Sequence, residues 1–182
     1  MKINLYALRA IYLHEMDRFR RTLTQSVLSP VLTTSLYFIV FGSVIGGYVE
    51  KIDGISYGSY IVPGLLMLTL LTQSISNTSF GIFFPKFNGT IYEILAAPIS
   101  TLEVVLAFVG AGATKTLIVS IIIFITSLFF VDVQVKYPLL MIFLLILVAF
   151  TFALFGFLIG LISSDFEQMS IICLLYTSDA AD

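Results

Sequence analysis

The sequence predicts an all-α integral membrane protein. Of its 182 residues, 59% are hydrophobic and only 11% are charged, and the mean hydropathy is +1.06. Soluble domains carry about 25% charged residues, and a water-soluble fold of this size cannot hide so much apolar surface. Long runs without charge alternate with short charged segments, as in helices that cross a bilayer. We therefore expect an N-terminal amphipathic interfacial helix, four transmembrane helices and a truncated fifth.

The charge-free runs place the expected spans, because a helix needs about 20 apolar residues to cross the hydrocarbon. Residues 22–49, 54–85 and 137–164 contain no charge, and residues 104–131 contain one, Lys115. A further apolar run begins near Met169 but gives way to polar residues after a few positions. That run is too short to cross a membrane.

The distribution of lysine and arginine predicts the orientation of the spans, since basic residues concentrate on the cytoplasmic side. A cytoplasmic N-terminus puts more basic residues inside than outside: Lys2, Arg9, Arg18, Arg20, Arg21 and Lys86 against Lys51 and Lys136. We therefore expect a multi-pass membrane protein with the N-terminus and the loop 85–103 in the cytoplasm.

Residues 1–25 have the pattern of an amphipathic helix. Apolar residues recur at spacings of three and four and share one narrow stripe: Leu5, Leu8, Tyr12, Met16, Phe19 and Leu23. The arginines lie off this stripe. The pattern indicates a helix in the plane of the membrane interface, and packing on another protein is the alternative.

The second expected span contains a helix breaker and a line of polar residues. Pro63 and Gly64 indicate either a simple kink or a bend that lines a passage. The polar line either joins neighbouring helices or faces a wet cavity; it consists of Thr69, Thr72, Gln73, Ser76, Asn77 and Ser79. Both alternatives stay open, and the candidates for a pathway lining are Pro63, Gly64, Gln73, Ser76 and Lys115.

Lys115 is the costliest residue of the chain if it lies at mid-bilayer, where a lysine costs about 2.5–3.5 kcal/mol. It would then face a wet path or a partner. The glycine-rich residues 110–114 before it suggest instead a break in the helix. We therefore expect Lys115 near the inner interface, where its stem carries the ammonium to headgroups or water.

The loop 85–103 predicts a short helix with an apolar face. Gly89 precedes this helix, Ile91, Ile94 and Leu95 share one side of it, and Pro98 prevents its continuation. A soluble partner could bury that side.

Catalytic signatures are missing from the sequence, which contains no Walker A loop and no His-Glu-x-x-His motif. The single cysteine, Cys173, excludes an internal disulfide framework, and the net charge of −2 implies no nucleic-acid partner.

Several stretches together resemble the permease subunit of type-2 ABC exporters of the bacterial inner membrane. They are the Pro63-Gly64 pair, GTIYEILAAPIS from Gly89, FVGAGATKTL from Phe108 and LFGFLIGLISSDFEQMS from Leu154. The resemblance implies a parent fold of six spans and a short cytoplasmic helix that docks on a separate ATPase. Two permease chains and two ATPase chains would form the exporter, with ATP and magnesium on the ATPase and no cofactor on this chain.

On this resemblance, the ATPase-coupling loop contains seven candidate residues: Gly89, Thr90, Ile91, Glu93, Ile94, Leu95 and Pro98. Residues 26–172 would be an incomplete transmembrane domain. Residues 173–182 resemble nothing in the family and are expected to be non-native. The alternatives are a secondary transporter, although the four spans show no inverted repeat, and a non-transporting membrane scaffold, which would have no reason to expose an apolar cytoplasmic face.

The expected topology is testable with an impermeant thiol reagent. On intact cells, a cysteine at Asp53 should be labelled, because the loop around it lies outside, whereas a cysteine at Asn4 should not be. Strong labelling at Asn4 with none at Asp53 would reverse the topology.

Overall fold

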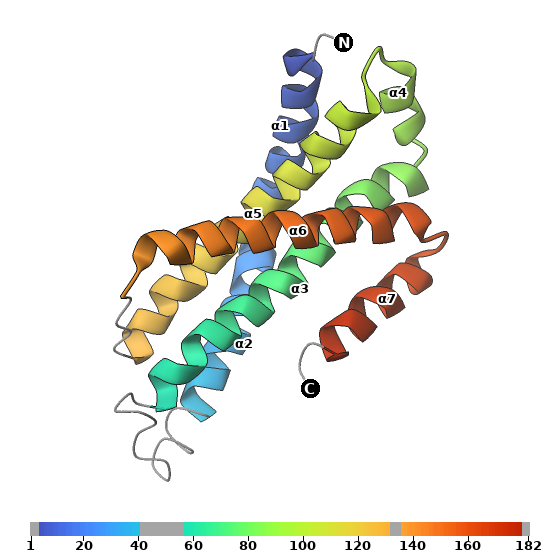
Figure 1. The fold of residues 1–182 in the computed structure, drawn as a ribbon. Helices are drawn as coiled ribbons and strands as arrows, with labels where there is room; N and C mark the ends of the chain where they lie inside the picture. The colour runs from blue at the N-terminus through green and yellow to red at the C-terminus, as the bar shows by residue number, and fades with distance from the viewer. Residues whose placement is uncertain (1–3, 41–56, 132–135, 180–182) are drawn as a thin grey trace.

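Seven helices make up the described part of the chain. The computed structural model describes residues 4–40, 57–131 and 136–179, and these ranges contain no β-strand. In chain order the helices are α1 (Leu5–Arg21), α2 (Leu23–Ile39), α3 (Tyr57–Phe87), α4 (Ile91–Ala96), α5 (Thr101–Phe130), α6 (Pro138–Ile162) and α7 (Phe166–Asp179) (Figure 1).

Three of these helices are long and apolar enough to cross a membrane. They are α3 from Ser59 to Phe87, α5 and α6, and they correspond to the expected spans 54–85, 104–131 and 137–164. The expected first span, 22–49, begins as α2, and its residues 41–49 lie outside the described residues. The all-α membrane class is confirmed, and the expected number of four spans stays a prediction.

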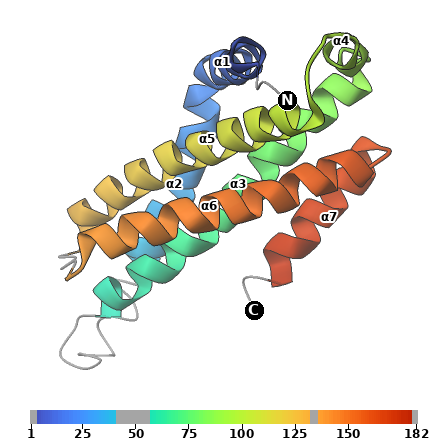
Figure 2. The same ribbon diagram turned by 45° about the horizontal axis from the view of Figure 1, so that its top comes forward.

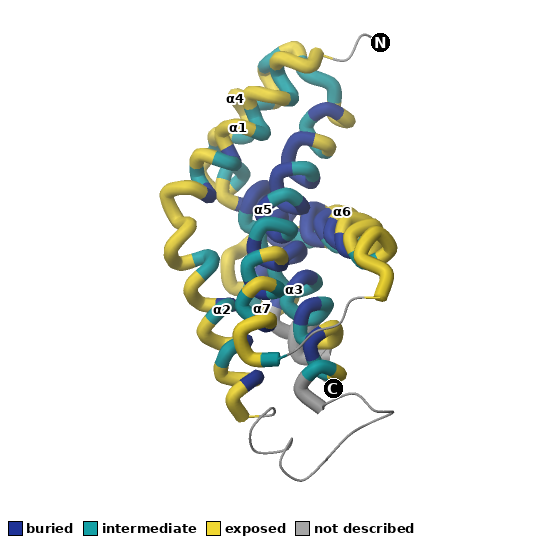
Figure 3. The backbone as a smooth tube through the Cα atoms, turned by 90° about the vertical axis from the view of Figure 1, so that its left-hand side faces the viewer, coloured by how far each residue is buried: buried dark blue, intermediate teal, exposed yellow. Residues whose placement is uncertain are grey.

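Helix α5 is the centre of the bundle. Helices α1, α2, α3 and α6 all pack against it, and Figure 3 shows it as the most deeply buried long helix. Its inner positions are small or β-branched side chains that let several neighbours approach: Ala107, Ala111, Ala113, Val119 and Ile123. Helices α1 and α4 both lie at the end of the bundle where α5 begins (Figures 1 and 2).

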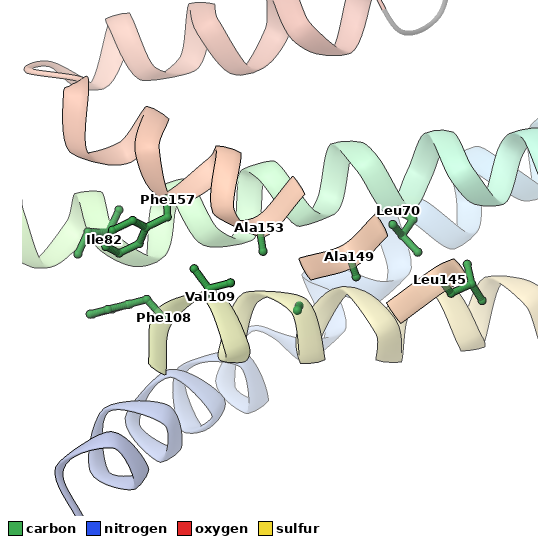
Figure 4. Packing of buried hydrophobic residues seen from close by; sticks show 9 residues of the cluster. Leu70, Ile82, Phe108, Val109, Leu145, Ala149, Ala153 and Phe157 are labelled. Atoms are coloured by element: carbon green, nitrogen blue, oxygen red, sulfur yellow. The ribbon is translucent and has the colours of Figure 1, made fainter. Parts of the chain in front are cut away.

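The closest helix crossing joins α3 to α6. Figure 4 shows Ala149, Ala153 and Phe157 of α6 facing the core. Two serines of α3 donate hydrogen bonds across the crossing, from Ser74 Oγ to the carbonyl of Ala149 at 2.7 Å and from Ser79 Oγ to the carbonyl of Gly156 at 2.8 Å. Bonds of this kind join membrane helices, so this part of the α3 polar line joins two helices.

Helix α7 turns back beside α3. Its first residue, Phe166, packs its ring on Phe80 and Phe83 at centroid distances of 5.9 and 6.3 Å, and Met169 is fully buried. The helix continues to Asp179, so it includes most of the segment 173–182. The expectation that this segment is non-native stays a prediction.

The α3–α6 crossing predicts that adding one methyl group at Gly156 destabilises the bundle. A Cβ at Gly156 would lie 2.5 Å from the carbonyl oxygen of Ile75 and 2.9 Å from its Cα. Since backbone cannot yield locally, Gly156→Ala should cost about 1–3 kcal/mol of unfolding free energy, measured by thermal unfolding in detergent. Gly110→Ala is the matched control, because a Cβ there meets nothing within 4 Å. Equal stability of the two variants would contradict the packing.

Candidate functional site

A buried ion pair joins α1 to the middle of α5. Lys115 Nζ of α5 lies 2.7 Å from Glu15 Oε2 of α1. The Lys115 residue is 3% exposed and Glu15 is 2% exposed. Because both charges are removed from solvent, each depends on the other.

The position of Lys115 corrects the expectation from sequence. Helix α5 is continuous from Thr101 to Phe130, so the glycine-rich residues 110–114 do not break it. Gly112 instead allows a close approach of α3, since a Cβ there would collide with the Thr78 hydroxyl. Lys115 therefore stays inside the bundle with Glu15 as its partner, and the expected snorkelling to headgroups or water is wrong.

Helix α3 and a second cation complete the surroundings of Glu15. Arg18 Nη2 lies 3.1 Å from the same Oε2 atom, and its guanidinium lies over the Phe84 ring at 5.8 Å. Gly81 of α3 lies beside the carboxylate, since a Cβ there would be 3.5 Å from Oε2, an ordinary van der Waals distance. The second oxygen, Oε1, is buried and has no hydrogen-bond partner. Through Oε2 the carboxylate joins α1 to α5, while α3 packs beside it at Gly81.

Two further contacts fasten α1 along the first half of α5. Glu103 Oε1 accepts a hydrogen bond from the backbone amide of Asn4 at 2.6 Å, and its Oε2 accepts one from the amide of Ser100 at 2.9 Å. Between the two ends, the Tyr12 hydroxyl donates to Thr114 Oγ1 at 3.1 Å. The two helices therefore run parallel and are joined at three levels. The expected interfacial position of α1 stays a prediction; of its apolar stripe, Met16 and Phe19 pack in a cluster that includes Val119 and Ile123 of α5.

The loop between α3 and α5 has the expected shape. Gly89 has a φ of +77°, which glycine adopts at no steric cost, and α4 follows from Ile91 to Ala96. Thr90, Glu93 and Pro98 are exposed. The loop is therefore a short helix placed between a glycine turn and a proline, as the sequence predicts.

Docking through α4 stays a prediction, and the structure shows which of its apolar side chains are exposed. Ile91 and Ile94 are half-buried and pack on the protein's own core. Their side chains are therefore largely covered within this chain. The apolar side chains that α4 exposes are Tyr92, at 73%, and Leu95, at 66%. Spacing places Ile91, Ile94 and Leu95 near one another, but the contacts with the rest of the bundle decide which residues face inward.

Lys86 anchors the start of the loop 85–103. Its Nζ donates to the carbonyl oxygens of Leu161 and Ser163 at 2.7 and 2.8 Å, which are the last carbonyls of α6. Cations are favoured at the C-terminal end of a helix, where carbonyl groups lack intrahelical partners. Lys86 therefore ties the end of α3 to the turn between α6 and α7.

A cavity of about 290 Å³ lies between α2 and α3. From α2 it is lined by Ser29, Pro30, Thr33, Thr34 and Tyr37, and from α3 by Leu65, Leu68, Thr69, Thr72 and Gln73. The polar line of α3 therefore has two different surroundings. Ser79 bonds to α6, whereas Thr69, Thr72 and Gln73 line this cavity.

Of the five candidates for a pathway lining, Gln73 lines the cavity. Pro63, Gly64, Ser76 and Lys115 are not among its lining residues; Pro63 and Gly64 are exposed, and Ser76 is half-buried. Whether any of the five lines a route for substrate stays a prediction. Within the described ranges, no group of three or more His, Cys, Asp or Glu side chains comes together to hold a metal ion.

Apolar helices of spanning length, packed around hydrophobic clusters and a few buried polar groups, define a multi-helix integral membrane protein. The sequence matches the family described as ABC-2 type transporter over residues 6–178. The chain belongs to the ABC-2 type transporter family, as the resemblance of its motifs predicts.

Curated relatives of this chain are inner membrane permeases. The "Inner membrane transport permease YadH" of Escherichia coli K12 is 37% identical over 166 residues, which cover 91% of this chain and 65% of the relative. Proteins of the same name from E. coli O157:H7 and Shigella flexneri match to the same extent. The chain thus spans about 65% of the length of these relatives. No solved structure matches the chain.

The buried pair predicts a strong dependence of stability on the two charges together. Lys115→Met leaves the Glu15 carboxylate buried without its nearest cation, so the free energy of unfolding should fall by about 3–5 kcal/mol. The double variant Glu15→Met and Lys115→Met should recover most of that loss, because no unpaired buried charge remains. Unfolding in detergent, followed by circular dichroism, measures both.

The control for this cycle is the exposed pair on the same helix. Asp17 Oδ1 and Arg20 Nη1 lie 4.0 Å apart, with side chains 65% and 80% exposed. Asp17→Asn should therefore change stability by roughly 0–1 kcal/mol. If Lys115→Met costs no more than this control, or if the double variant is no better than the single one, Glu15 and Lys115 do not form the pair described.

Proposed function

We propose that this chain is the greater part of the membrane subunit of an ATP-driven exporter, which forms the substrate pathway and docks a separate ABC ATPase through the loop 85–103. The observation that carries the proposal is the exposed apolar face of α4. Tyr92 and Leu95 extend from a short helix at one end of the bundle and are each more than half exposed. Large apolar groups at such a position favour a soluble protein partner.

The attachment of α4 supports the transmission of force from an ATPase. On one side, Lys86 holds the end of α3 to α6. On the other side, Glu103 holds the start of α5 to α1. A displacement of α4 therefore acts on packed helices rather than on a loose loop, and packed helices move as units.

A second copy of the chain would complete the pathway in this proposal. Ser29 and Thr33 are exposed on α2, and polar side chains at a helix surface favour a protein or water neighbour over lipid. A permease homodimer would place this side of α2, and the cavity behind it, toward the second subunit or toward water. ATP and magnesium would bind only to the ATPase subunits.

Neither alternative accounts for α4. A secondary transporter draws on an ion gradient and needs no soluble motor, and a membrane scaffold needs no apolar helix held between two fixed ends. The docking helix therefore favours the ATP-driven exporter over both. The name of the YadH relatives, inner membrane transport permease, agrees with this choice.

The proposal predicts that a charge at Leu95 disrupts docking. Leu95→Asp in the full-length permease, co-expressed with a candidate ABC ATPase subunit that co-purifies with the unchanged permease, should reduce ATPase co-purification by at least about tenfold, since burying an unpaired carboxylate in an interface is costly. Leu139→Asp is the control, because Leu139 is 85% exposed near the opposite end of the bundle. Equal retention of the ATPase by both variants, at equal membrane abundance, would contradict docking through α4.

A further inference from the structure

The cavity between α2 and α3 has a chemical character that indicates what it binds. Seven of its ten lining residues carry a hydroxyl or amide group, and Pro30, Leu65 and Leu68 are apolar. The residues that line it in the described part of the chain carry no charge. Mostly apolar walls that carry uncharged polar groups can hydrogen-bond a ligand and do not attract ions.

Three of the lining threonines use their hydroxyl protons within their own helices; of these, Thr69 and Thr72 are half-buried and Thr34 is 3% exposed. Thr34 Oγ1 donates to the carbonyl of Pro30 at 2.6 Å, and Thr69 Oγ1 donates to the carbonyl of Leu65 at 2.7 Å. Thr72 Oγ1 likewise donates to the carbonyl of Thr69, at 3.1 Å. A hydroxyl has one O–H, and after donating it keeps its oxygen lone pairs as acceptors. These lone pairs fit ligand groups that donate.

Gln73 adds a donor to these acceptors. Its Oε1 accepts a hydrogen bond from Asn77 Nδ2 at 3.4 Å, and the amide nitrogen carries two N–H groups. A ligand that both donates and accepts, such as an alcohol or an amide, therefore matches the walls. Hydrogen bonds of this kind fix the orientation of a ligand within a mostly apolar pocket.

The charges of Lys115 on α5 and of Lys86 at the end of α3 are engaged elsewhere. Lys115 is paired with Glu15, and Lys86 bonds to the end of α6. An anionic ligand would thus find acceptor oxygens and no cation from the lining residues, and a cationic ligand would find no carboxylate among them. Burying an unpaired charge is far more costly than burying a hydroxyl that is hydrogen-bonded.

The size of the cavity limits the part of a ligand that it can hold. A volume of about 290 Å³ is at the small end of ligand pockets, which run from roughly 300 to 1,000 Å³. This is enough for a compact head group and too small for a long acyl chain as well. Pro30, Leu65 and Leu68 provide the apolar contacts where such a chain would begin.

We propose that this cavity binds the uncharged, hydroxyl- or amide-bearing head of an amphiphile. The proposal rests on the proposed function only in taking the cavity as part of the substrate route. Because the lining residues carry no charge, the cavity would bind an uncharged head group more tightly than an anionic or cationic one on the same chain length.

Three photoreactive amphiphiles test this proposal on the protein in lipid nanodiscs. They share a diazirine-bearing decyl chain and differ in the head: a glucoside, a carboxylate and a trimethylammonium group. Mass spectrometry maps the cross-links. The glucoside should label residues 29–37 and 65–73 saturably, at least about tenfold above the other two, since the loss of one or two matched hydrogen bonds corresponds to that factor. Equal labelling by a charged head, or no saturable labelling, overturns the proposal.

Matched variants distinguish binding in the cavity from partition into lipid. The double variant Thr72→Val and Gln73→Leu keeps the shape of the wall and should abolish the preference for the glucoside. Thr151→Val is the control, because Thr151 is exposed on α6 and its hydroxyl bonds to the carbonyl of Leu147 at 2.8 Å. A glucoside preference unchanged in the double variant overturns the proposal. Saturable labelling without ATPase docking would overturn the proposed function alone, and docking without labelling would overturn the cavity assignment alone.

Discussion

The ion pair between Glu15 and Lys115 is the constraint on which the arrangement of this protein depends. A lysine in the middle of an apolar helix requires a partner, and the carboxylate that meets it comes from α1, 100 residues earlier in the chain. This contact sets α1 against α5, and the contact of Glu103 with Asn4 then fixes the starts of both helices. Because α4 directly precedes α5, the same contacts also define where the exposed face of α4 is held.

The bundle combines two kinds of helix contact. At the α3–α6 crossing, Gly156 and Gly160 bring the backbones together, so a Cβ at either glycine would collide with α3. Between α2 and α3, by contrast, side chains border a mostly apolar cavity that carries uncharged polar groups. In the proposed exporter the first contact transmits movement and the second admits a ligand. The polar residues of α3 serve both, since those on one side bond to α6 and those on the other line the cavity.

The sequence predicts local properties of this fold well and long-range partners poorly. The absence of charge identifies α3, α5 and α6, and Gly89 adopts the positive φ that its place before α4 suggests. The position of Lys115 could not be predicted from its own surroundings, because one sequence does not show which carboxylate lies beside it. The spacing around Glu15 did indicate that this acid is buried. Glu15 follows Leu8 by seven residues and precedes Phe19 by four, which puts it on the buried face of α1. For α4, spacing groups Ile91 and Ile94 correctly, but only packing shows that they face inward.

The most direct test of the central claim is the distance between α1 and α5. Spin labels at Leu13 of α1 and Leu106 of α5, both about half exposed, in a Cys173→Ser background, report that distance by double electron–electron resonance. If the Glu15–Lys115 pair fixes the two helices, the distance distribution should be narrow, should broaden in Lys115→Met, and should narrow again when Glu15→Met is added. Distributions of equal width in all three proteins would show that the pair does not hold α1 in place.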